Sequence, residues 1–311
     1  MTTTISSSST IPVVDLTKSD DECITRIKQA CETTGFFYLA GHELEEDMID
    51  RIFCGAREFF KLDQEIKNDF SAKEGEHPFG YQSISNFDTE REQIKLCRQY
   101  YLTDHQAFMN KTYQREKKNA EYNQRVGWLS KVGTSERWRT EVNEYFQHVS
   151  NLAKRLRHFI ASSLELDPEY FDKLYHTHVE LMDINYYHAK KSNNDLDMGL
   201  HPQGSFKERL NSHTDYGMLT FLMDQSPGLK VCKNKEKCLA ACDLDDEDEW
   251  IDVKPLKNHF IVNIGDMLER WTSGQYVSNL HRVVNSSNQD KLSIAFFTDP
   301  NIASKLFDEM F

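Results

Sequence analysis

The sequence predicts a mainly β protein with flanking helices, in which a helical N-terminal region precedes a β-rich C-terminal half. Two observations lead to this prediction. Long apolar stripes at helical spacing occupy the first half of the chain. Between residues 179 and 300 the pattern changes to seven short apolar runs, broken by Gly, Asn, Pro and acidic clusters. Such a succession is typical of a β-sandwich or barrel.

The first elements can be assigned from periodicity. "IPVVDL" at 11–16 and "GFFYLAG" at 35–41 are predicted strands. Between them a helix is expected to begin near Asp20 and to stop at Gly35, with Ile24, Ile27 and Ala30 on its buried stripe. A second helix follows, with an apolar stripe made of Met48, Ile49, Ile52, Phe53, Ala56, Phe59 and Phe60.

The middle of the chain contains one strong element. Residues 103–133 are polar without clear periodicity, so no element is assigned there. A long helix is predicted from about Ser135 to Leu166, because Pro168 disfavours helix at the residue before it. The runs that follow are "ELMDINYY", "MLTFLM", "LKVC", "WIDV", "HFIVNIGDML", "VSNLHRVVN" and "KLSIAFFTD".

Composition limits the function. The chain of 311 residues is 39% hydrophobic, enough for a sizeable core. Its net charge of −13 repels phosphate groups and anionic lipids, which argues against nucleic acid or membrane partners. No apolar stretch approaches the roughly 18 residues of a membrane span. Residues 1–10 lack the features of a secretion signal, so we expect a disordered tail and a cytoplasmic protein.

The cysteines predict reduced thiols. Seven cysteines, an odd number, are scattered through the chain, which does not suggest a disulfide framework. Cys232, Cys238 and Cys242 are close in sequence but lack the paired CxxC spacing of a structural zinc site.

A candidate metal site lies at the entrance to the run 218–223. In a strand, His213 and Asp215 would point to the same side because residues two apart share a face. His281, in a later β-like run, is the candidate third ligand. Two histidines and one carboxylate leave about three positions of an ion open, which suits iron(II) oxygen chemistry. A structural zinc site would close all four of its positions.

A candidate anion receptor lies ten residues after His281. Lys291 and Ser293 alternate with apolar residues on the last β-like run, and Ala295 and Phe297 continue the same face. A buried cation beside a hydroxyl group can bind a carboxylate. The sequence therefore predicts that an anionic group binds near the metal.

These motifs resemble the iron(II)/2-oxoglutarate-dependent oxygenases of the isopenicillin N synthase-like family. The similar stretches are "IPVVDL", "ACETTGFFYLAGH", "AREFFKLDQEIK", "GYQS", "INYY", "HTDYGMLTFL", "NIGDMLERWTSGQYVSNLHRVV" and "KLSIAFFTDP", in this order. The resemblance implies a double-stranded β-helix (jelly roll) core at 179–300, backed by helices at 131–178. It also implies a substrate-facing N-terminal oxygenase region at 11–130, made of helices and edge strands, and a C-terminal tail at 301–311.

The resemblance also implies the ligands. Iron would be held by His213, Asp215 and His281, and 2-oxoglutarate would bind the metal through its keto-acid end. Its far carboxylate would be met by Lys291, Ser293 and Tyr187. Two positions depart from the family pattern, which usually has arginine at 291 and proline at 188, where this chain has lysine and histidine. Lysine can neutralise a carboxylate but cannot form the bidentate fork of arginine.

The implied activity is hydroxylation or desaturation of a small organic metabolite with O2, giving succinate and CO2. Arg209, Tyr81 and Phe297 are candidates to contact that substrate. Two alternatives stay open. One is an oxidase of the isopenicillin N synthase type, which needs no 2-oxoglutarate, and the other is a non-catalytic metabolite-binding module. Neither the substrate nor the oligomeric state follows from the sequence.

Overall fold

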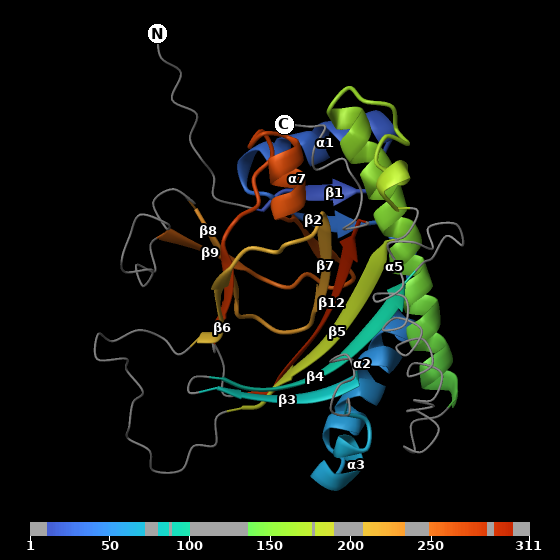
Figure 1. Ribbon diagram of the computed structural model, residues 1–311, viewed down its shortest axis with the longest axis vertical. Coiled ribbons are helices and arrows are strands. Elements are labelled where there is room, and N and C mark those ends of the chain that lie inside the picture. Colours follow the sequence, from blue (N-terminus) through green and yellow to red (C-terminus); the bar gives the residue numbers. More distant parts are fainter. Residues whose placement is uncertain are drawn as a thin grey trace, which may run out of the picture.

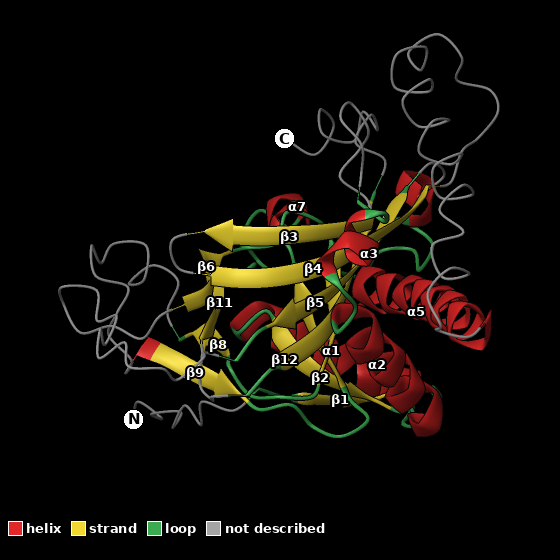
Figure 2. Cartoon of the chain, turned by 90° about the horizontal axis from the view of Figure 1, so that it is seen from below, coloured by secondary structure: helices red, strands yellow, loops and turns green. Residues whose placement is uncertain are grey.

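Two β-sheets pack against each other, and helices cover the outer face of the larger one (Figures 1 and 2). The computed structural model describes residues 11–71, 80–86, 89–99, 136–175, 178–189, 208–233, 249–284 and 289–300. The sandwich core between the sheets contains Phe36, Tyr38 and Ile261 from the larger sheet, and Val231 and Val283 from the smaller one. The mainly β jelly-roll prediction is confirmed.

The larger sheet combines strands from both halves of the chain. Its order is β1 (Val13–Asp15), β2 (Phe36–Ala40), β10 (Phe260–Ile264), β7 (Leu219–Asp224), β12 (Lys291–Asp299), β5 (Val179–Tyr187), β4 (Thr89–Gln99) and β3 (Gly80–Asn86). The smaller sheet has the order β6 (Glu208–His213), β11 (His281–Val284), β8 (Leu229–Cys232) and β9 (Trp250–Val253). Strands from the N-terminal region thus form both edges of the larger sheet.

The helices follow the predicted stripes. They are α1 (Asp20–Thr33), α2 (Glu46–Phe60), α3 (Gln64–Asn68), α5 (Glu136–Ser163) and α7 (Asp266–Trp271), with a 3-10 turn at Asp172–Tyr175. The Ser19 hydroxyl accepts the Glu22 amide at 3.3 Å and so caps α1. Gly35, after α1, has φ +70, and a Cβ there would lie 1.9 Å from the Val277 carbonyl oxygen. Only glycine fits this crossing between α1 and β2.

Three boundaries differ from the predictions. The long helix ends at Ser163, short of Leu166, because the chain turns at Glu165 with φ 61. The run "HFIVNIGDML" is not one strand, since β10 ends at Ile264 and α7 begins at Asp266. The run "VSNLHRVVN" contributes only β11 to a sheet. Strands β3, β4 and β6 were not predicted, because their sequences carry no clean apolar alternation.

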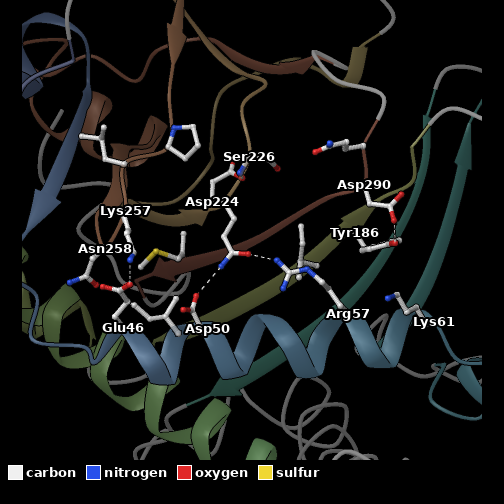
Figure 3. A pocket seen from close by; sticks show the side chains of 17 residues that line it. Glu46, Asp50, Arg57, Lys61, Tyr186, Asp224, Ser226, Lys257, Asn258 and Asp290 are labelled. Carbon is white, nitrogen blue, oxygen red and sulfur yellow. Dashed lines mark hydrogen bonds and ion pairs between the residues drawn. The ribbon is translucent and has the colours of Figure 1, made fainter.

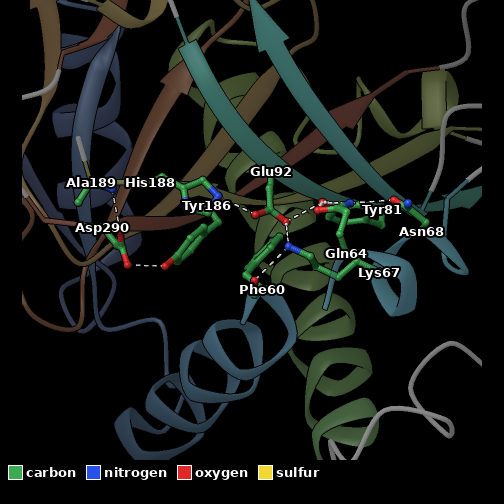
Figure 4. A network of polar contacts seen from close by, with 10 residues as sticks. All are labelled: Phe60, Gln64, Lys67, Asn68, Tyr81, Glu92, Tyr186, His188, Ala189 and Asp290. Carbon is green, nitrogen blue, oxygen red and sulfur yellow. Dashed lines mark hydrogen bonds and ion pairs between the residues drawn. The ribbon is translucent and has the colours of Figure 1, made fainter. Parts of the chain in front are cut away.

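A buried polar network ties α3 to the β3–β4–β5 part of the larger sheet (Figure 4). The Glu92 carboxylate accepts the Lys67 ammonium at 2.5 Å and the Tyr81 hydroxyl at 2.6 Å through one oxygen. Its other oxygen lies 2.6 Å from His188 Nε2. The ends of β4 and β5 are thereby fixed on the side of the sheet that faces the helices.

Two further observations concern the expected environment. Within the described ranges, no helix is long and apolar enough to cross a membrane. Cys23, Cys31 and Cys54 are free, but Cys232 is disulfide-bonded, so the prediction of reduced thiols is wrong for that residue. Spacing along the chain did not reveal which sulfur atoms the fold brings together.

Candidate metal centre and co-substrate pocket

Three potential metal ligands converge between the two sheets. His213 ends β6, His281 begins β11, and the two are directly paired in the smaller sheet. Asp215 lies in the turn that leads to β7, and its Oδ1 is 3.8 Å from His213 Nε2 and 3.7 Å from His281 Nε2. The three ligand atoms lie within 4.8 Å of one another, and no other such group occurs among the residues that the structure describes.

The reason for the convergence differs from the one predicted. β6 ends at His213, so Asp215 does not share a strand face with it. The turn is instead fixed by a hydrogen bond of 2.8 Å from the Asp266 amide to the Asp215 carbonyl, and by one of 3.1 Å from the Gly265 amide to the Met218 carbonyl. A Cβ at Gly265 would lie 2.2 Å from the Gly217 carbonyl oxygen, so this contact requires glycine.

Asp215 is oriented by two neutral donors. Its Oδ2 accepts the Thr220 hydroxyl at 2.6 Å and the Asn263 amide at 2.7 Å, which leaves Oδ1 directed at the histidines. Burial raises the pKa of this carboxyl, but His281 and the two hydrogen bonds outweigh burial and hold the pKa below its ordinary value. The carboxylate is therefore ionised and can act as a ligand through one oxygen.

His281 is buried in a form suited to metal binding. Its Nδ1 lies 3.3 Å from the Asn279 carbonyl, a contact that leaves Nε2 without its proton. Burial lowers the pKa of His281, although Asp215 opposes this effect. The Phe36 and His281 rings pack in a T-shaped contact with their centroids 5.4 Å apart, which restricts rotation of the imidazole. A neutral imidazole with a fixed orientation is a good ligand for a divalent ion.

The donor set fits a ferrous ion. Ligand atoms about 2.1 Å from an ion and at right angles to each other lie about 3 Å apart. The separations of 3.7 and 3.8 Å are somewhat larger, so small side-chain movements suffice to reach this geometry. Two imidazoles and one carboxylate on one side of the ion leave the opposite side open.

Thr220 offers a direct test of this orientation. Thr220→Val keeps the shape of the side chain but removes a donor to Asp215, so we expect the affinity for Fe(II) to fall about 10- to 100-fold. Thr220→Ser keeps the hydroxyl and should bind Fe(II) nearly as the wild type does. Anaerobic titration with Fe(II) measures both variants, and unchanged affinity in Thr220→Val would contradict the role given to this hydrogen bond.

The predicted anion receptor lies on the inner face of the larger sheet. Lys291 is paired across the strands with Tyr187, and Ser293 with Asn185, so all four side chains point to the same side. All are buried. Sequence reasoning missed Asn185, whose Oδ1 has no hydrogen-bond partner in the described part of the chain. A polar residue inside an apolar strand was the available signal.

The three substrate candidates have different positions. Phe297 is on the inner face and is paired with Thr220, close to the metal ligands. Tyr81 lies on the opposite face, in the core with Phe59, so the expectation that it lines the substrate cavity is wrong. Strand alternation puts its neighbour Gln82 on the inner side instead. Arg209 belongs to β6, but its side chain lies outside the described residues.

A cavity of about 650 Å³ lies between α2 and the ends of β7 and β12 (Figure 3). Its wall includes Asp50, Arg57, Asp224 and Asp290, but none of the three converging ligands. Arg57 is hydrogen-bonded to Gln225, and the Tyr186 hydroxyl is hydrogen-bonded to Asp290. This cavity is therefore separate from the candidate metal centre. Asp224 nevertheless links the two regions, because it also contacts Lys291 of the predicted anion receptor.

Known protein families match this chain over most of its length. Residues 179–300 match the model of the 2OG-Fe(II) oxygenase superfamily, and residues 11–128 match that of the non-haem dioxygenase N-terminal region named for morphine synthesis. Lateral branching oxidoreductase 1 of Arabidopsis thaliana is 30% identical over 94% of this chain and 71% of its own length. The chain belongs to the 2-oxoglutarate/Fe(II) oxygenase superfamily. This oxygenase therefore uses Fe(2+), 2-oxoglutarate and O2.

Other relatives agree with this assignment. A 2-oxoglutarate-Fe(II) type oxidoreductase of Emericella nidulans is 27% identical over 89% of this oxygenase and 74% of its own length. The structure of dioxygenase for auxin oxidation 1 of Arabidopsis thaliana, in a binary complex with 2-oxoglutarate, superposes with a TM-score of 0.69 at 21% identity. That superposition covers 96% of this oxygenase and 95% of the Arabidopsis chain, which shows that the fold is shared.

Proposed function

We propose that this dioxygenase hydroxylates or desaturates a small organic metabolite at an iron held by His213, Asp215 and His281. The observation that carries the proposal is the orientation of Asp215, whose Oδ2 is occupied by Thr220 and Asn263 while Oδ1 is directed at both histidines. A carboxylate buried only for stability would have no need to direct one oxygen at two imidazoles while the other accepts both hydrogen bonds.

The chain's own residues prepare the reaction. His213, Asp215 and His281 would hold the ion from one side, which would leave its other positions for the co-substrate and O2. An iron ion and 2-oxoglutarate, when bound there, would supply oxidation of a substrate C–H bond by O2, with one oxygen atom of O2 entering succinate as 2-oxoglutarate loses CO2 and the other serving to oxidise the substrate. Phe36, which belongs to the apolar cluster between the sheets, packs against His281 and covers that side of the site.

The inner face of β12 orients the two organic molecules. Ser293, Tyr187 and Lys291 form the end that we propose to receive the far carboxylate of 2-oxoglutarate. Phe297, near the metal ligands, is proposed to border the substrate. Arg209 also remains a proposed substrate contact. The enzyme would thus place a substrate C–H bond next to the open side of the ion.

Spectroscopy tests the proposal without knowledge of the substrate. Anaerobic addition of Fe(II) and 2-oxoglutarate is expected to produce the weak visible charge-transfer band of the chelate, and admission of O2 should then release succinate. Iron binding without the band would instead favour an oxidase independent of 2-oxoglutarate. Absence of iron binding would favour a non-catalytic binding module and contradict the proposal.

A further inference from the structure

The ammonium group of Lys291 is surrounded by acceptors from its own chain. It donates to Asp224 Oδ2 in a close ion pair, to the Ser226 carbonyl at 2.6 Å and to the Pro227 carbonyl at 3.5 Å. A lysine ammonium has three N–H groups. Each of them therefore has an acceptor within the protein before any co-substrate binds.

Asp224 is fixed in this position from two sides. It is the last residue of β7 and is paired with Ser293 on β12, so it lies beside the proposed carboxylate receptor. Its second oxygen, Oδ1, accepts the Ser226 amide at 3.2 Å. The side chains of Lys291 and Asp224 are only 3% and 2% exposed. Solvent therefore screens the charges of this pair very little.

The electrostatic consequence is that the receptor end is close to neutral. The negative charge of Asp224 cancels the positive charge of Lys291 for any group bound beside them. Among the residues that the structure describes, the next cation along this face of the sheet is Arg91 on β4, whose guanidinium carbon lies 6.0 Å from the centroid of the intervening Tyr187 ring. The far carboxylate of 2-oxoglutarate, if it bound at Lys291, would be the second carboxylate beside this lysine. It would meet a neutral ion pair, and burial of a charge without a compensating opposite charge is costly.

We propose that Asp224 sets the affinity and the selectivity of the co-substrate site, because it neutralises the lysine that would bind the far carboxylate of 2-oxoglutarate. The inference rests on the proposed function. It predicts that the wild-type protein gains little from that carboxylate and so discriminates weakly between 2-oxoglutarate and a 2-oxoacid of the same length that lacks it.

The experiment compares two ligands that share the metal-binding end. Dissociation constants for 2-oxoglutarate and 2-oxopentanoate are measured by anaerobic titration of the Fe(II)-loaded protein. Their ratio, the 2-oxopentanoate constant divided by the 2-oxoglutarate constant, reports only the far carboxylate. In Asp224→Asn we expect this ratio to rise about 10- to 100-fold over the wild type, which is the effect of one additional hydrogen bond to a charged group.

Lys291→Gln keeps the test decisive if Asp224→Asn does not fold. Lys291→Gln leaves Asp224 unneutralised, so the ratio should fall at least about tenfold below the wild-type value. The double variant Asp224→Asn, Lys291→Gln is again neutral and should return close to the wild type. The control is Asp50→Asn on α2. Asp50 lines the 650 Å³ cavity that Asp224 also lines, but it does not contact Lys291, so this variant should leave the ratio unchanged.

Each outcome has one meaning. An unchanged or lower ratio in Asp224→Asn, or an unchanged ratio in Lys291→Gln, would overturn the proposed role of Asp224. A parallel change of both dissociation constants in Asp224→Asn would also overturn it, because the shared chelating end would then account for the effect. Failure of both 2-oxoacids to bind the iron-loaded wild type would instead contradict the proposed function.

Discussion

Asp215→Asn is expected to reduce the affinity for Fe(II), and with it the formation of succinate, by more than about 100-fold. This change preserves the size of the side chain but removes the charge and one of the acceptor oxygens between the two histidines. Loss of a residue that only supports a ligand costs about 10- to 100-fold in metal affinity, and loss of the ligand itself should cost more.

Anaerobic titration with Fe(II) and a succinate assay measure this prediction. The matched control is Asp252→Asn on β9, which removes a carboxylate that is 69% exposed and is paired with Lys230 in the smaller sheet. That variant should bind iron and form succinate like the wild type. If Asp215→Asn retained wild-type iron affinity, the assignment of all three ligands would have to be abandoned.

Glu92→Ala is expected to lower the free energy of unfolding by about 3–5 kcal/mol. The change leaves the Lys67 ammonium, whose side chain is only 6% exposed, without its carboxylate partner. Removal of one member of a buried ion pair has a cost of this size because the remaining charge is uncompensated. The Tyr81 hydroxyl also loses its acceptor at 2.6 Å.

Denaturant unfolding with a matched ion-pair control tests this effect. Glu22→Ala on α1 breaks the pair of Glu22 with Arg26, but both side chains are substantially exposed, at 43% and 51%. Its expected cost is about 1 kcal/mol or less. An equal loss of stability in the two variants would show that the buried network contributes no more than a surface pair.

Glu92 is also expected to make the stability of the fold depend on pH in acid. Burial alone would raise the pKa of Glu92, but hydrogen bonds from Lys67, Tyr81 and His188 outweigh it and hold the pKa below its ordinary value of 4.5. This stabilisation is therefore fully present above about pH 4.5 and is lost as the pH falls through the folded-state value. Glu92→Gln, which cannot ionise, should lose less stability than the wild type over that interval.

Elements with mainly apolar buried side chains could be predicted from the sequence, whereas strands with many polar side chains could not. The stripes of α1 and α2 and the alternation of β12 identified those elements, because their apolar residues report burial directly. Strand β4 carries buried polar residues on both faces, with Glu92 on one face and Gln93 on the other. Local hydrophobicity cannot indicate burial where hydrogen bonds and ion pairs compensate the buried polar groups.

The class of enzyme could be predicted from the sequence alone. Residue types and order were enough to predict two histidines and an aspartate for iron, and a lysine with a serine for a carboxylate. Only the tertiary structure decided how these groups face one another. The pairing of β6 with β11 brings His213 and His281 together, Thr220 and Asn263 select which oxygen of Asp215 is available, and Asp224 occupies Lys291. Strand register and long-range hydrogen bonds arise from the packing of distant segments, which no local pattern records.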